Sequence, residues 1–440
     1  MLRISRLPVS HLHSKYQRII IISIETNRYT MMKSMHETHN TQQPAIPGYL
    51  IFMLALTAGM AVASLYYCQP LLALLGNDFH LNSATVGTLP TLTQAGYALG
   101  LMLLIPLGDK FDRRRVILVK GLALAAALAF TAVSPGLALL LVASFIVGIT
   151  ATMAQDVIPT AAAMTDSRQR GRVVGQVMTG LLTGILLSRV FSGFIGEWFG
   201  WRSVYLAAAA AMLLVTILLW RALPRFTPAS TLSVGQLYRS MFSLLATHAK
   251  LQKAAVAQGL LNAAFSAFWS TLALMLYQNF HLGSSAAGLF GLAGAVGALT
   301  APFFGKAADR FGPQRMTRIG ALLTGVSFLL MLFAGSAINT TWYLPILAVL
   351  TVSFDMGVQM CLISHQTIIY NTAPHAMSRA NAILLAGVFI GMTSGSLVAS
   401  QLFSHWGWQA VIAFATLVST LALLLRLLPE RRTMISDSVI

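Results

Sequence analysis

The stretch "GKAADRFGPQR", residues 305–315, lies between two long apolar runs. A related stretch, "IPLGDKFDRRR", occupies residues 105–115, so that Asp109 and Asp309 are 200 residues apart. Only 9% of the chain is charged, yet it places an aspartate beside clustered basic residues twice, at matching positions. Internal similarity of this kind indicates a duplicated structural unit. We therefore interpret the chain as two related halves.

The composition excludes a water-soluble protein. Of the 440 residues, 56% are hydrophobic, and the mean hydropathy is +0.73. A soluble domain carries about a quarter charged residues. Apolar stretches recur from Gly48 onward, each close to the roughly twenty residues that a helix needs to cross a bilayer. Lipid offers no partner to backbone groups and the runs lack alternation with period two, so we predict an all-α membrane protein.

Glycine, proline and charge clusters divide the apolar runs into separate predicted helices. The twelve predicted spans are 48–72, 83–107, 115–133, 137–164, 171–196, 201–222, 254–279, 284–307, 314–335, 342–370, 378–403 and 407–428. An even number of crossings places both ends of the chain on the same side of the membrane.

The longest polar interruption, residues 224–253, follows the sixth span and is predicted to be a cytoplasmic linker. It separates a six-helix bundle at 47–223 from a second one at 254–429, which gives two pseudo-symmetric bundles. Residues 1–46 are predicted to be a disordered basic extension, and residues 430–440 a cytoplasmic tail.

The net charge of +17 could indicate a nucleic-acid partner, but its distribution argues otherwise. Basic residues form short clusters in the turns on one side of the predicted spans, whereas Arg202 stands alone on the other side. This bias predicts a multi-pass protein with both termini in the cytoplasm and no nucleic-acid partner. Cys68 and Cys361 lie in apolar runs and provide neither a metal site nor a disulfide framework.

With these repeats and spans, the chain resembles the major facilitator superfamily from about Gly48 to Leu428. The signature of that family is G-x-x-x-D-[RK]-x-G-[RK]-[RK], in the turn after the second span, with a degenerate copy after the eighth. The matching residues are Gly305, Asp309, Arg310 and Gly312 in the second copy, and Asp109, Lys110, Arg114 and Arg115 in the first. Ile105 and Asp112 stand at the two glycine positions of the first copy and depart from the pattern.

The signature has a physical rationale. A carboxylate at the end of one helix can accept hydrogen bonds from arginines and from a helix amino terminus across the turn. The resemblance implies that Asp109 and Asp309 latch the two halves together when the cavity faces outward. Their loss would then shift the conformational population rather than abolish binding. The alternative is that Arg113–Arg115 only fix the topology.

Four predicted spans, the second, fifth, eighth and eleventh, are rich in glycine. The glycines recur at helical spacing within residues 96–100, 180–196, 288–297 and 387–395. Small residues let helices approach closely in lipid. The resemblance implies that the second span packs on the eleventh and the fifth on the eighth, across the interface between the halves. The alternative is tight packing within each half.

Four ionisable residues within the spans are candidates for proton coupling: Asp355, Asp156, His365 and Arg189. Either aspartate could be protonated and deprotonated during transport, and histidine titrates in a range that suits proton exchange. Arg189 could serve as a counter-charge or bind an anionic group of the substrate. Its depth differs from that of Asp156 by roughly 10 Å, which argues against a permanent pair. Alternatively, Asp156 bonds the backbone of span five or tethers the cytoplasmic end.

Polar and aromatic residues of spans one, two, four, seven and ten are expected to line a central cavity. The candidates are Tyr66, Tyr67, Gln69, Thr93, Gln94, Gln155, Asn262, Trp269, Gln359 and Gln366. Uncharged amides beside aromatic rings suit a neutral or amphiphilic solute. Tyr66 and Tyr67 equally fit an aromatic belt at the membrane boundary.

The sequence thus predicts a secondary transporter of the bacterial inner membrane that works by alternating access, similar to the family's sugar-efflux and multidrug branch. We expect a monomer that exports a small organic solute against proton entry. No phosphate-binding loop of the G-x-x-x-x-G-K-[ST] type is found, so ATP is not expected to drive it. No cofactor, metal site or catalytic triad is predicted, and an enzyme is not expected.

Two departures weaken the drug-antiporter interpretation. Ser144 stands where such antiporters carry an arginine in span four, and "GILLSRVFSGFIG", residues 184–196, lacks the proline of their span-five motif. An importer, working as a facilitator or proton symporter for a small metabolite, remains open. So does a membrane sensor or scaffold that transports nothing.

Overall fold

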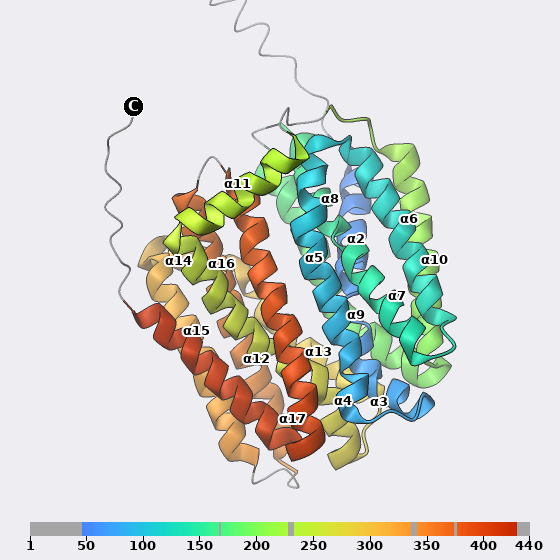
Figure 1. Ribbon diagram of the computed structural model, residues 1–440, viewed down its shortest axis with the longest axis vertical. Helices are drawn as coiled ribbons and strands as arrows, with labels where there is room; N and C mark the ends of the chain where they lie inside the picture. Colours follow the sequence, from blue (N-terminus) through green and yellow to red (C-terminus); the bar gives the residue numbers. More distant parts are fainter. Residues whose placement is uncertain (1–45, 167–168, 228–232, 336–340, 374–375, 429–440) are drawn as a thin grey trace, which may run out of the picture.

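The computed structural model describes residues 46–166, 169–227, 233–335, 341–373 and 376–428 (Figure 1). The side chains at 109, 295–299, 301–302 and 378 also lie outside the description. Nearly all of the predicted amino-terminal extension, 1–46, and the whole of the predicted tail, 430–440, therefore fall outside the described residues. Within the described ranges, every regular element is a helix, as the composition predicts.

The first half of the chain forms α2 to α10. These helices are α2 (Gly48–Ala63), α3 (Cys68–Asp78), α4 (Ser83–Val86), α5 (Thr88–Lys110), α6 (Arg113–Ala132), α7 (Leu137–Ala151), α8 (Met153–Ala163), α9 (Arg170–Phe199) and α10 (Trp201–Ala222). The first predicted span is longer than expected and broken, because α2 and α3 meet at an angle of 40°. Pro70 lies in the first turn of α3, where its missing N–H leaves no helical hydrogen bond unmade.

The second half forms α12 to α17. These helices are α12 (Ala249–Phe280), α13 (Ser284–Leu299), α14 (Ala301–Phe311), α15 (Pro313–Ala334), α16 (Tyr343–Thr372) and α17 (Met377–Leu427). The helix α17 consists of two helical segments joined at a kink. Gly407 forms the kink with φ 72°, a conformation that glycine adopts readily. The eleventh and twelfth predicted spans therefore meet at this kink.

By length and apolar composition, nine helices of the described residues can cross a membrane, or ten when α2 and α3 count as one span. That count takes α17 as a single helix, although Gly407 divides it into two crossings. The helices α13 and α14, which follow each other across Thr300, supply the remaining crossing. The architecture is thus the predicted bundle of two six-helix halves, which lie side by side in Figure 1.

The most extensive contacts between the halves are made by two pairs of helices: α9 packs on α13, and α5 packs on α17. These pairings confirm the expectation that the second span faces the eleventh and the fifth faces the eighth. At the first contact, a methyl group on Gly288 would lie 2.6 Å from the carbonyl oxygen of Arg189 and 3.3 Å from the Cα of Gly193. Only glycine allows backbones to approach this closely.

Most glycines in these spans, however, serve packing within one half. A methyl group on Gly180 would lie 2.5 Å from the carbonyl oxygen of Ala55 on α2. Gly96 and Gly100 press against α7 in the same way, and Gly391 presses against α12. Both alternatives are therefore realised, each on a different face of the same helices.

The predicted linker, 224–253, contains the helix α11 (Val234–Thr247), and α12 begins within it at Ala249. Figure 1 shows α11 lying across one end of both bundles. Tyr238 of α11 donates a hydrogen bond of 2.6 Å to the carbonyl of Leu103 on α5, whereas Arg379 on α17 donates one of 2.5 Å to Ser240. We call this end of the molecule, where α2 begins and α17 ends, the termini side.

Candidate substrate and coupling site

Arg189 of α9 lies buried at the interface between the halves, with 3% of its surface exposed. Its Nε donates a hydrogen bond of 2.8 Å to Gln69 Oε1 on α3. Its guanidinium carbon lies 4.6 Å from the ring centre of Tyr66 and 4.2 Å from that of Trp269 on α12. Two aromatic faces from opposite halves therefore enclose one buried cation, a stabilising arrangement when water is excluded.

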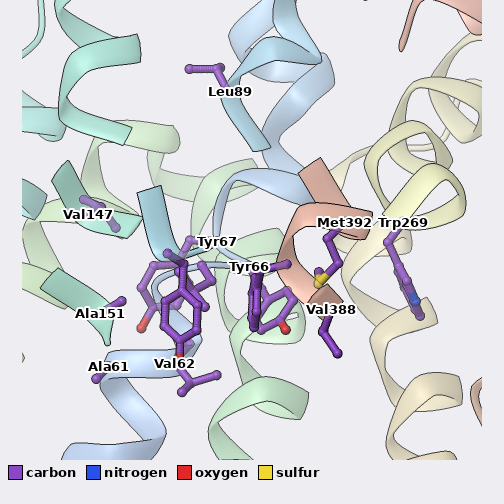
Figure 2. Packing of buried hydrophobic residues seen from close by; sticks show 14 of the residues in the cluster. Ala61, Val62, Tyr66, Tyr67, Leu89, Val147, Ala151, Trp269, Val388 and Met392 are labelled. Carbon is purple, nitrogen blue, oxygen red and sulfur yellow. The ribbon is translucent and has the colours of Figure 1, made fainter. Parts of the chain in front are cut away.

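The side chains that frame Arg189 come together although they are far apart in sequence. Figure 2 shows Tyr66, from the turn between α2 and α3, and Trp269, from α12, with Val388 and Met392 of α17 between them in this view. All four belong to one buried cluster that spans both halves. Tyr66 is buried here rather than part of an aromatic belt at the membrane boundary.

Asp355 of α16 is the second buried charge of this region, with 5% of its surface exposed. A methyl group on Gly294 of α13 would lie 2.5 Å from Asp355 Oδ2 and 3.0 Å from Trp269 Cζ2. The carboxylate and the indole thus approach the same point of α13. Asp355 and Arg189 interact electrostatically, but no direct ion pair joins them in the described part of the chain.

Four polar atoms of this cluster have no hydrogen-bond partner among the described residues. Three are donors, Gln69 Nε2, Arg189 Nη2 and Trp269 Nε1, and the fourth is the acceptor Asp355 Oδ1. Trp269 nevertheless interacts with the Asp355 carboxylate, so its N–H is less available than the other two donors. Buried polar groups are normally satisfied, because leaving one unsatisfied costs about 1–3 kcal/mol. Gln69, Arg189, Trp269 and Asp355, together with Tyr66, are called the central cluster below.

Asp156 of α8 lies apart from the central cluster. Its Oδ2 is 2.6 Å from the Nζ of Lys120 on α6, and both side chains are buried within the first half. The described partner of Asp156 is therefore a lysine of α6 in the same half. The alternatives in which Asp156 bonds the backbone of span five or tethers the cytoplasmic end stay predictions. Lys120 was not anticipated as its partner. Its place five residues beyond Arg115, inside the third span, was the overlooked signal.

His365 of α16 is also apart from Asp355, ten residues or about 15 Å along the same helix. Its Nδ1 lies 2.8 Å from Gln258 Oε1 on α12, and Gln258 donates a hydrogen bond of 2.8 Å to Asn262. His365 and Asn262 thus belong to a separate buried network inside the second half. Sequence reasoning missed Gln258, which stands one helical turn before Asn262 on the same face.

Two of the predicted cavity residues connect to the opposite half. Gln94 of α5 accepts a hydrogen bond of 3.1 Å from Ser266 on α12. Gln155 of α8 donates one of 3.2 Å to Tyr97, whose ring centre lies 4.3 Å from that of Phe389 on α17. Tyr97 and Ser266 were not anticipated.

The remaining predicted cavity residues lie elsewhere. Tyr67 packs edge-on against Tyr205 at 6.4 Å within the first half, and the hydroxyl of Thr93 donates to a carbonyl of its own helix. Gln366 donates a hydrogen bond of 3.2 Å to Asn381. Gln359 is half-buried on α16.

At the first signature copy, several groups bond within the first half. Asp112 stands where the signature has a glycine. It caps α6, because its side chain accepts a hydrogen bond of 3.0 Å from the backbone N–H of Arg114. Arg114 donates to the carbonyl of Trp220, and Arg113 donates to that of Pro159 at 3.1 Å. Lys110 ends α5, and Arg115 lies in the first turn of α6. The side chain of Asp109 lies outside the described part.

At the second copy, Asp309 and Arg310 are exposed near the end of α14, and Gly305 lies one turn earlier. No ion pair of Asp309 occurs within the described residues. Gly312 has φ +88°, a conformation that explains why this motif position favours glycine.

On the side opposite the termini, the halves touch directly. Asn77 of α3 donates a hydrogen bond of 3.1 Å to the Tyr277 hydroxyl on α12. Glu197 of α9 accepts one of 2.6 Å from the backbone of Ser285 at the start of α13. The central cluster is therefore separated from this side by contacts between the halves.

The sequence profile of the Major Facilitator Superfamily matches residues 51–363 and 254–438. The chain belongs to this superfamily. It is 36% identical over 370 residues to the uncharacterized transporter YgaY of Escherichia coli O157:H7, a match that covers 84% of this chain and 92% of that protein. It is 31% identical over 369 residues to the probable transporter SCO4007 of Streptomyces coelicolor, covering 82% and 83% respectively.

Solved structures of other transporters share the fold. A bacterial homolog to the human lysosomal transporter Spinster, in an inward-facing and occupied conformation, superposes with a TM-score of 0.71 at 15% identity, covering 87% of this chain and 96% of that one. The nucleoside transporter NupG superposes with a TM-score of 0.70 at 15% identity, covering 86% and 98%. The protein is thus a multi-pass membrane transporter of the Major Facilitator type.

Proposed function

We propose that this transporter exports a small organic solute, sugar-like or amphiphilic, in exchange for protons. The observation that carries the proposal is the central cluster, in which Arg189 from the first half and Asp355 from the second are both buried beside one indole. Charges buried among membrane helices are costly and are retained where a transporter binds its substrate or its coupling ion.

The arrangement supports coupling by competition. Asp355 Oδ1 lacks a partner among the described residues, so either a proton or a donor group of the solute can occupy the carboxylate. Because the two occupants exclude each other, binding of one favours release of the other, which is the requirement for antiport. Arg189 attracts the ionised carboxylate across the interface, so neutralising it weakens the link between the halves.

Alternating access follows from the two-half architecture. The halves touch on the side opposite the termini through Asn77 and Tyr277, and Asp309 is exposed on the termini side. In the alternative conformation, we propose that Asp109 and Asp309 close the termini side through the basic residues of the signature. The solute then crosses the membrane as the protein alternates between the conformation closed on the side opposite the termini and the one closed on the termini side.

We further propose that the termini side is cytoplasmic and that the protein resides in a bacterial inner membrane. The basic cluster Arg113–Arg115, at the start of α6, and Lys250, at the start of α12, both lie on this side. One chain supplies Arg189 and Asp355, so the proposed functional unit is a monomer.

The test uses inverted membrane vesicles that contain the protein and a pH-sensitive fluorescent dye. After respiration acidifies the interior, addition of a transported solute should release protons and recover the fluorescence, and vesicles with Asp355→Asn should show no recovery. Solutes come from a growth screen of an overexpressing strain against toxic compounds. Flux without proton movement would contradict the coupling, proton and solute moving together would favour the symporter, and no flux would favour the scaffold.

A further inference from the structure

Resting on the proposed function, we propose that the solute is a zwitterion of the α-amino-acid type with an apolar side chain. Its carboxylate would lie on Arg189 and Gln69, and its ammonium group on Asp355. This inference rests on the central cluster, in which a buried cation and a buried carboxylate each lie beside polar atoms that lack a partner among the described residues.

The donor side of the cluster matches a carboxylate. Arg189 Nη2 and Gln69 Nε2 lack acceptors within the described part of the chain, and both side chains are at most 3% exposed. The indole N–H of Trp269 interacts with the Asp355 carboxylate instead. A carboxylate offers about four lone-pair sites and a full negative charge, and guanidinium binds it in a fixed fork geometry. A neutral sugar would offer acceptors but no charge to balance the buried arginine.

The acceptor side matches an ammonium group. Asp355 Oδ1 is unpartnered among the described residues, and Arg189 is not in direct contact with it. A solute with only a negative charge would add a second anion near Asp355, and one with only a positive charge would add a second cation near Arg189. A zwitterion compensates both, and it adds no net charge to the membrane interior.

Aromatic rings and glycines pack closely around the two charged side chains. Phe265 lies 6.2 Å from Trp269 and 6.4 Å from Phe354 between ring centres, which gives the cluster an apolar wall. On α13, a methyl group on Gly291 would lie 2.9 Å from Arg189 Cβ, and one on Gly294 would lie 2.5 Å from Asp355 Oδ2. The backbone of α13 therefore lies directly against Arg189 and Asp355, and glycine is needed at both positions for this close approach.

The proposal also gives antiport a chemical cause. An ammonium group and a proton compete for the same carboxylate, so they cannot be bound together. A purely anionic solute would instead favour the protonated form of Asp355 and would move with the proton. The direction of coupling therefore depends on the positive group of the solute.

The experiment measures binding to the purified full-length protein by calorimetry. The probes are phenylalanine, leucine, methionine and tryptophan, each compared with its amide, which lacks the carboxylate, and with its N-acetyl derivative, which lacks the ammonium group. At least one zwitterion should bind ten-fold or more tightly than both of its derivatives. Binding of an amide or an N-acetyl derivative as tightly as every zwitterion, or of no zwitterion, would overturn the proposal.

Two variants test each contact separately. Arg189→Gln should remove the preference for the zwitterion over the amide and keep the preference over the N-acetyl derivative, and Asp355→Asn should do the reverse. Arg172→Gln, an exposed position on the same helix as Arg189, should change neither. A misfolded variant would lose both preferences together. If both variants lose the two preferences to the same extent, the assignment of the carboxylate to Arg189 and of the ammonium group to Asp355 is wrong.

The two proposals can fail independently. Zwitterion binding without proton flux in the vesicles would overturn the proposed antiport and leave the substrate class standing. Proton-coupled flux of a neutral sugar, without binding of any zwitterion, would overturn the substrate class and leave the antiport standing.

Discussion

Lys120 and Asp156 form a buried ion pair inside the first half, with 2.6 Å between Nζ and Oδ2. The pair joins α6 to α8, and less than a tenth of either side chain is exposed. Of the two aspartates that the sequence placed within the spans, one therefore already has a cation beside it, and the other, Asp355, lies at the interface between the halves.

We expect Asp156→Asn to destabilise the protein, because it leaves the Lys120 ammonium group buried without its carboxylate. Breaking one side of a buried pair costs about 3–5 kcal/mol. The melting temperature of the purified variant should fall, whereas the double variant Lys120→Met with Asp156→Leu should recover much of the loss. If Asp156→Asn keeps its melting temperature and loses proton coupling instead, Asp156 has the coupling role.

Asp355→Asn should abolish proton-driven transport and leave the fold intact, because an amide of the same shape cannot exchange a proton. The measurement is solute flux in vesicles with and without a pH gradient. The gradient should increase the flux through the unmodified protein at least ten-fold and leave the flux through the variant unchanged. Asp166→Asn removes an exposed carboxylate and should behave like the unmodified protein. Gradient-driven flux in Asp355→Asn would remove Asp355 from the mechanism.

Gly288→Val should separate the halves on the side opposite the termini, since even a methyl group there would lie 2.6 Å from the Arg189 carbonyl. Spin labels at Gly136→Cys and Asn279→Cys, with Cys68 and Cys361 replaced by serine, report the distance between the halves on that side. The distance distribution should move to longer values. The matched control is Gly175→Val on α9, where a methyl group meets nothing within 4 Å.

Asp309→Asn should favour the conformation of this structure, in which the halves touch on the side opposite the termini. Asp309 is exposed in this conformation, and we propose that it binds basic residues of the signature only when the termini side closes. With the same spin labels, the population of short distances should rise severalfold, while solute affinity in that conformation stays unchanged. A shift toward long distances, or no shift compared with Asp166→Asn, would argue against the latch.

Much of the fold follows from the sequence because a bilayer reduces the choices. Lipid forces backbone hydrogen bonds inside each helix, so apolar length alone marks the spans from Gly48 to Leu428. The glycine content of α5, α9, α13 and α17 also marked the helices that join the halves. It did not show which glycines face the interface, since Gly288 does and Gly180 packs within its own half.

The central cluster could be predicted only in part. Residue counting gives the depth of a side chain along its helix at about 1.5 Å per residue, which brought Arg189 and Asp355 to notice as buried charges. Counting does not give the direction in which the side chain points around the helix axis. It therefore did not distinguish Asp156, which pairs with Lys120 of its own half, from Asp355, which interacts electrostatically with Arg189 of the other half.

The sequence by itself determined that this protein lies in a membrane, that it consists of two related halves, and which helices meet between those halves. Each of these properties depends on composition and on spacing along one chain. The tertiary structure alone decided which polar side chains share a place. Arg189, Gln69, Trp269 and Asp355 come from four helices, and their contact depends on how those helices rotate and cross as glycine-lined surfaces pack. Such crossings arise from interactions between distant segments, which no local pattern records.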